Sequence, residues 1–133
     1  MTINKIDLAY IIDDDEIIIY LTGALIKKEE FCNRTETFTD GLQAIKRLKV
    51  AIENNEDLPQ VILFDLNMPV MDGWEFVDAY MKLGIDKSIP LFVFTSSINP
   101  ADKEKSFSYT SIKGFIQKPL TKQKLDKILR IIS

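Results

Sequence analysis

Apolar runs and segments with helical spacing alternate five times along the chain. The strand-like runs are short and rich in β-branched and aromatic residues, and they lie at 6–12, 34–38, 61–64, 91–94 and 114–117. The first, third and fourth are almost continuously apolar, which is typical of central strands covered on both faces. The second run is more polar and is therefore expected at an edge of the sheet.

Apolar residues between these runs recur at helical spacing. The last helix shows this most clearly, with apolar positions at i, i+3, i+4 and i+7: Leu125, Ile128, Leu129 and Ile132. The segment 101–109 has only a thin apolar stripe. Four polar residues are expected to cap helices, because their side chains accept hydrogen bonds from free N–H groups: Asp15, Asp40, Asn99 and Thr121.

Five strand–helix units with short connections predict an α/β fold. Parallel neighbours need crossovers, so the helices cover both faces of a parallel sheet, and right-handed crossovers favour a doubly wound (βα)5 arrangement. The length of 133 residues fits a single domain over 1–133. In such sheets the functional site lies beyond the carboxyl ends of the strands.

Composition narrows the function classes. The net charge of −3 argues against direct nucleic-acid binding, which needs a clustered positive surface. No apolar run approaches the length of a membrane span, and the start lacks a signal-peptide pattern, so we expect a cytoplasmic protein without membrane insertion. The single cysteine, Cys32, excludes an internal disulfide and is read as a packed thiol rather than a redox group.

Polar side chains follow four of the expected strands. Three acidic residues follow the first strand, and the others come one from each of three later strands: Asp13, Asp14 and Asp15, then Asp65, Thr95 and Lys118. The carboxyl ends of parallel strands meet at one rim, so we expect these groups to converge.

Clustered carboxylates raise one another's pKa unless a cation lies among them. The chain contains no histidine, and oxygen ligands alone favour Mg2+. Together, Mg2+ and Lys118 would neutralise ionised Asp13, Asp14 and Asp65. A phosphoryl group on Asp65 would then find donors in Lys118 and in the hydroxyl of Thr95.

The stretch 63–73, Leu-Phe-Asp-Leu-Asn-Met-Pro-Val-Met-Asp-Gly, resembles the phosphorylation loop of response-regulator receiver domains of two-component signalling. The acidic residues after the first strand, Thr95-Ser96 and Lys118-Pro119 match the same family in the same order. The resemblance covers essentially the whole chain, and it implies the flavodoxin-like strand order 2-1-3-4-5.

For the acidic residues, the resemblance implies a phosphoacceptor and a metal site. Asp65 would receive a phosphoryl group from a histidine kinase or a histidine phosphotransfer protein. Asp14 and Asp65 would bind Mg2+ directly, together with the backbone carbonyl of Asn67, while Asp13 would act mainly through a bound water. Asn67 and Ser97 flank the site and are expected to influence the access of water.

For the remaining residues, the resemblance implies a switch. Thr95 would bond a phosphoryl oxygen, Lys118 would pair with the phosphoryl group or the carboxylate, and Phe115 would change rotamer. The Lys118–Pro119 bond would be cis. The surface formed by the helix at 101–109, the strand at 114–117 and the last helix would change for a downstream protein target. The chain ends right after the last helix, so we expect a stand-alone receiver. The resemblance implies a signalling domain that catalyses its own Mg2+-dependent phosphorylation and dephosphorylation.

Three other functions compete with this interpretation. An FMN binder of the same architecture would need a glycine- and hydroxyl-rich phosphate loop where this chain has Asp13 to Asp15. An aspartyl-nucleophile phosphatase would carry its nucleophile after the first strand rather than at Asp65. A degenerate receiver used only for docking would not need the complete set of acidic, hydroxyl and ammonium groups.

Overall fold

The computed structural model describes residues 6–85, 88–96 and 98–132, and five strands and five helices alternate along them. The strands are β1 (Leu8–Ile12), β2 (Arg34–Phe38), β3 (Val61–Phe64), β4 (Leu91–Thr95) and β5 (Ile112–Gln117). The helices are α1 (Glu16–Lys28), α2 (Gly41–Glu53), α3 (Gly73–Lys82), α4 (Pro100–Ser106) and α5 (Lys122–Ile132).

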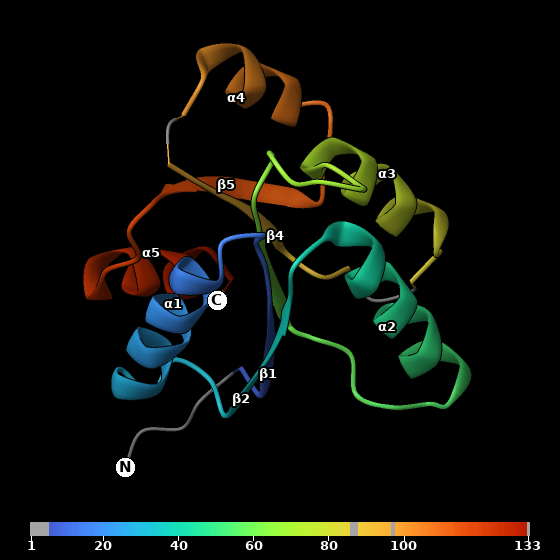
Figure 1. Cartoon of the computed structure of the whole chain (residues 1–133), viewed down its shortest axis with the longest axis horizontal. Helices are drawn as coiled ribbons and strands as arrows, with labels where there is room; N and C mark the ends of the chain where they lie inside the picture. Colours follow the sequence, from blue (N-terminus) through green and yellow to red (C-terminus); the bar gives the residue numbers. More distant parts are fainter. Residues whose placement is uncertain (1–5, 86–87, 97, 133) are drawn as a thin grey trace.

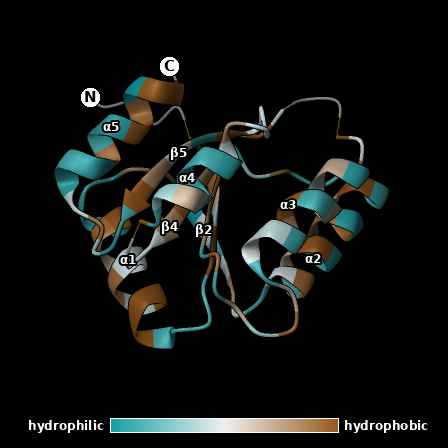
Figure 2. Ribbon diagram, turned by 90° about the horizontal axis from the view of Figure 1, so that it is seen from above, coloured by the Kyte–Doolittle hydropathy of each residue, from teal (hydrophilic) through white to brown (hydrophobic). Residues whose placement is uncertain are grey.

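The strands form one parallel sheet in the order β2-β1-β3-β4-β5, as the sequence predicts. Helices α1 and α5 lie on one side of the sheet, and α2 and α3 lie on the other (Figures 1 and 2). Each side has its own apolar core: Ile26, Leu125 and Ile128 pack under α1 and α5, while Leu48 and Phe76 pack under α2 and α3. The doubly wound α/β fold is confirmed.

The burial of the strands follows their position in the sheet. Every residue of β1, β3 and β4 is buried, whereas β2 lies at an edge and is partly exposed, as expected. Strand β1 begins at Leu8, two residues later than expected. Strand β5 begins at Ile112, two residues earlier, because Leu91 pairs with Ile112 and Phe92 with Gly114, so that Lys113 is an extra residue in the ladder.

Helix starts follow the predicted caps. The carboxylate of Asp40 accepts a hydrogen bond from Gln43 N, and the side chains of Asp15, Asn99 and Thr121 accept corresponding bonds at α1, α4 and α5. Helix α4 ends at Ser106, short of the expected residue 109. Turn-type bonds replace helical ones beyond this point, since Tyr109 N donates to Ser106 O.

Two further expectations concern membrane insertion and the cysteine thiol. Within the described ranges, none of the helices has the length and apolar character needed to span a membrane. Cys32 is buried and free, and its Sγ lies 3.2 Å from the backbone carbonyl oxygen of Arg34. Cys32 is therefore a packed thiol beside β2.

Candidate functional site

The carboxyl ends of the central strands carry the predicted site, and backbone hydrogen bonds hold its residues in place. Asp13 N donates to Phe38 O and Asp65 N donates to Ile12 O, both at 3.0 Å. Lys118 N donates to Thr95 O at 2.8 Å. These bonds extend the ladder one step beyond the strand ends, so the sheet itself sets the spacing of the site.

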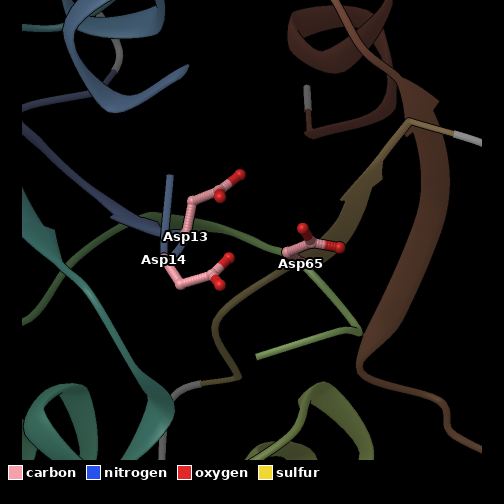
Figure 3. Close-up of side chains that lie close together, drawn as sticks. All are labelled: Asp13, Asp14 and Asp65. Carbon is pink, nitrogen blue, oxygen red and sulfur yellow. The ribbon is translucent and has the colours of Figure 1, made fainter. Parts of the chain in front are cut away.

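Three carboxylates gather at this rim. Asp13 and Asp14 extend from the end of β1 and Asp65 from the end of β3 (Figure 3). One carboxylate oxygen from each residue lies within 4.8 Å of the others. Asp13 is fully buried, Asp65 is 7% exposed and Asp14 is exposed. The cluster is therefore open to solvent on the side of Asp14.

Lys118 joins two of these carboxylates. Its Nζ lies 2.5 Å from Asp13 Oδ2 and 3.0 Å from Asp65 Oδ2. The ammonium also lies 5.6 Å from the centroid of the Phe94 ring. One ammonium against three carboxylates leaves an excess of negative charge when all are ionised. The donor set of carboxylate oxygens at this spacing fits a hard divalent cation.

Burial and charge pairing shift the pKa values of this pair. Burial raises the pKa of Asp13, although hydrogen bonds from Lys118 and from the backbone N–H of Asp15 partly offset the rise. Burial alone would lower the pKa of Lys118, but its hydrogen bonds to Asp13 and Asp65 outweigh that effect and raise it. Lys118 is therefore an ammonium at neutral pH.

The remaining predicted site residues lie around the cluster. Thr95 is buried at the end of β4, and Phe115 on β5 is half-buried against the core under α2 and α3. Asn67 is exposed, with its backbone N–H 3.4 Å from Asp65 Oδ1. The Lys118–Pro119 bond is cis, as the resemblance implies. Ser97, expected to influence water access, lies outside the described residues.

Sequence reasoning missed the role of Gly73 at this site. A Cβ at Gly73 would lie 2.7 Å from both the backbone O of Asp65 and the Cα of Leu66. Gly73 N also donates to Leu66 O at 2.9 Å. An Asp-Gly pair in a sequence indicates a turn, but not this close approach. The missing side chain of Gly73 lets α3 start directly against the strand end that carries Asp65.

The described fold agrees with comparisons to known proteins. The family model for the response regulator receiver domain matches residues 9–130. This chain belongs to that family. A structure of a two-component response regulator from Cytophaga hutchinsonii is similar, with a TM-score of 0.88 and 27% identity over 97% of this chain and 98% of that one.

Some of the similar proteins are much longer than this chain. The sensor histidine kinase CheAY of Helicobacter pylori is 29% identical over 69% of this chain. The matched region makes up only 11% of the length of that kinase. The fold also matches the receiver domain of sensor histidine kinase PA1611 from Pseudomonas aeruginosa, solved with a magnesium ion in its active-site cleft. That match has a TM-score of 0.75 and 20% identity over 95% of this chain and 97% of that one.

Proposed function

We propose that Asp65 accepts a phosphoryl group from a phosphohistidine donor, and that this phosphorylation switches a protein-binding surface. The observation that carries the proposal is the contact of Lys118 with both Asp13 and Asp65 at the strand-end rim. A lysine in this position neutralises part of the charge at the acceptor and can later bind a phosphoryl oxygen. Membership of the receiver family supports the same chemistry.

Asp13, Asp14 and Asp65 would hold Mg2+, with the backbone carbonyl of Asn67 as a further ligand. Asp14 and Asp65 would bind directly, and Asp13 through a water. The cation would neutralise charge on the acceptor and on the transferred phosphoryl group. The magnesium ion in the cleft of the PA1611 receiver domain supports this choice of metal.

The chain's own groups prepare Asp65 as a nucleophile. Lys118 engages Oδ2, while the Asn67 N–H approaches Oδ1 only at 3.4 Å. We assign the attack on phosphorus to Oδ1, the less engaged oxygen. A new O–P bond forms as the P–N bond of the donor breaks, and its electron pair returns to the imidazole ring. The Thr95 hydroxyl then donates a hydrogen bond to a phosphoryl oxygen.

The response of the chain would begin at Thr95. Its movement toward the phosphoryl group would leave room for Phe115, which is half-buried in the conformation described and can move further inward. The surface of α4, β5 and α5 would change with it and be presented to a downstream protein. This role is that of a signalling domain that catalyses its own phosphorylation and dephosphorylation.

The partner that supplies the phosphoryl group needs a surface beside the rim. Helix α1 starts directly after Asp15 and exposes an apolar stripe of Ile17, Tyr20 and Leu21, whose exposed fractions are 70%, 73% and 56%. We assign this stripe to the histidine kinase or histidine phosphotransfer protein that acts as donor. We further propose a single receiver domain over 1–133 that acts in the cytoplasm without direct nucleic-acid contact.

A titration with Mg2+ and beryllofluoride, a mimic of the phosphoryl group, tests the proposal. Mg2+ alone should shift amide NMR signals of the wild type at the rim, and a second, saturable set of shifts that extends into β5 should appear only when beryllofluoride is also present. Asp65→Asn should abolish the response, and Glu16→Gln, an exposed change at the start of α1, should leave it intact. A wild type that does not respond, or an Asp65→Asn variant that does, contradicts the proposal.

A further inference from the structure

Helix α4 is loosely attached to the body of the domain. Of its seven residues, only Ser106 is buried. Its position relative to the sheet must therefore depend largely on side chains near its C-terminal end and on the segment 107–111 that leads into β5. In Figure 1 the chain runs from the end of α4 past the N-terminal part of α3 into β5.

One face of α3 receives this segment. Trp74, Asp78 and Met81 are spaced i, i+4 and i+7 on α3 and so share a face. The Tyr109 ring stacks on Trp74, with centroids 5.6 Å apart and an interplanar angle of 27°. The Tyr109 hydroxyl donates to Asp78 Oδ1 at 2.9 Å. Ser111 Oγ lies 3.6 Å from Met81 Sδ.

Helix α4 contributes a cation to the same contact. Lys105 Nζ lies 4.6 Å from the centroid of the Trp74 ring, a cation–π geometry. Trp74, Asp78, Lys105 and Tyr109 thus form one cluster between α3 and α4, here called the α3–α4 clasp. Trp74 is the only tryptophan in the chain.

The clasp is anchored on the backbone that carries Asp65. Trp74 directly follows Gly73, whose N–H donates to Leu66 O and whose lack of a side chain lets it approach the backbone O of Asp65. A capping box of Asp72 and Glu75 fixes the first turn of α3. The α3 side of the clasp is therefore held rigidly against the end of β3.

The other side of the clasp leads into the strand that carries Phe115. Ile112 N, at the start of β5, donates to Tyr109 O at 3.2 Å. Phe115 follows three residues later and packs, with Tyr109 and Ile112, against the same core. A movement of Phe115 further inward must therefore be accommodated by the segment that the clasp holds.

We propose that the α3–α4 clasp is a restraint on the phosphorylation switch: it stabilises the conformation described here and opposes the rearrangement of α4 and β5. The inference rests on the proposed function, because it concerns how readily phosphorylation at Asp65 moves that surface. A ligand that favours the rearranged state has to overcome the free energy of the clasp. Weakening the clasp must therefore increase the affinity for such a ligand.

Matched lysine variants test this inference. Lys105→Met removes the cation over Trp74. Lys103→Met removes another exposed lysine of α4, whose hydrogen bonds to the described residues come from its backbone, to Asn99 O and from Ser106 Oγ. Tyr109→Phe removes the bond to Asp78 while keeping the ring. The probe is beryllofluoride with saturating Mg2+, followed by amide NMR at the rim, and hydrogen exchange of 105–112 is measured in parallel.

We expect Lys105→Met to bind beryllofluoride about two- to fivefold more tightly than the wild type, the factor for an exposed cation–π contact. Tyr109→Phe should change the affinity in the same direction, and amides in 105–112 should exchange faster in both variants. Lys103→Met should match the wild type.

If the affinity of Lys105→Met for beryllofluoride is equal to or lower than that of Lys103→Met, the clasp is not a restraint, even where the wild type responds normally. A wild type that binds no beryllofluoride overturns the proposed function and this inference with it. The two failures are therefore distinguishable in one set of titrations.

Discussion

The Nζ atom of Lys118 lies 2.5 Å from Asp13 Oδ2, closer than its 3.0 Å approach to Asp65 Oδ2. The ammonium is thus shared between the phosphoacceptor and a fully buried carboxylate from a different strand. This shared contact connects the stability of the rim to its chemistry, because removing the ammonium leaves two carboxylates without their cationic partner.

Lys118→Met should therefore destabilise the domain in the absence of Mg2+. The expected loss is about 3 kcal/mol in the free energy of unfolding, the lower end of the range for a broken buried ion pair, because Asp13 can take up a proton. Added Mg2+ should stabilise the variant more than the wild type. Urea unfolding with and without Mg2+ measures both effects. Lys122→Met, at an exposed pair with Asp126, is the control, and equal losses in the two variants would refute this role.

Gly73→Ala should be poorly tolerated. The new methyl group would lie 2.7 Å from backbone atoms of Asp65 and Leu66, which cannot rotate away as a side chain can. We expect a loss of about 1–3 kcal/mol, as for an overpacked core, together with weaker phosphorylation, because α3 must move away from the acceptor. Thermal melts measure the loss. Gly23→Ala, on α1 with open space around it, is the control and should be neutral or stabilising. Similar melting of both variants would argue against the close approach.

Asp14→Asn should weaken Mg2+ binding on the order of tenfold or more. Loss of a residue that only hydrogen-bonds to a metal ligand already has an effect of this size, so loss of a direct ligand should have at least as large an effect. Asp14 is the exposed member of the cluster, so its replacement leaves the buried ion pair in place. Calorimetric titration with Mg2+ measures the change, with Glu16→Gln as the control. Removing Mg2+ with a chelator should also stop phosphorylation of the wild type. Unchanged Mg2+ affinity in Asp14→Asn would rule out its assignment as a ligand.

The buried thiol gives an expected pH dependence. Burial raises the pKa of Cys32 from 9.0 to about 11, so the unfolded chain loses this proton at lower pH than the folded chain does. The free energy of unfolding that the protonated thiol contributes is complete below pH 9 and is lost as the pH rises toward 11. The loss is at most about 3 kcal/mol, at roughly 1.4 kcal/mol for each unit of difference in pKa. Urea unfolding at pH 8 and pH 11 should show a larger fall for the wild type than for Cys32→Ala. An equal fall would exclude Cys32 as the cause.

The sequence predicts the strand-end residues well because their position depends only on the order of elements. Asp13, Asp65 and Lys118 each follow a strand directly and Thr95 ends one. Parallel strands bring their carboxyl ends together whatever the details of packing. Predicted helix caps such as Asp40 succeed for a similar reason, since a cap is a local interaction.

The features that sequence reasoning missed depend on distances between separate elements. The Asp72-Gly73 pair gives a turn signal, but not the 2.7 Å approach that requires glycine. The stack of Trp74 on Tyr109 joins two segments without a shared pattern. The early start of β5 involves Lys113, a residue whose polarity hides the strand and whose place in the ladder is set by its neighbour β4.

Phosphorylation of Asp65 itself is tested most directly by incubating the chain with acetyl phosphate and Mg2+, followed by mass spectrometry of the intact protein and of its peptides. We expect the wild type to gain the mass of one phosphoryl group on the peptide that contains Asp65, and to lose it in hydroxylamine, which cleaves acyl phosphates. Asp65→Asn should gain none at this peptide. A phosphoryl group carried elsewhere in the wild type, or its absence when Mg2+ is bound, would contradict the assignment of Asp65 as the phosphoacceptor.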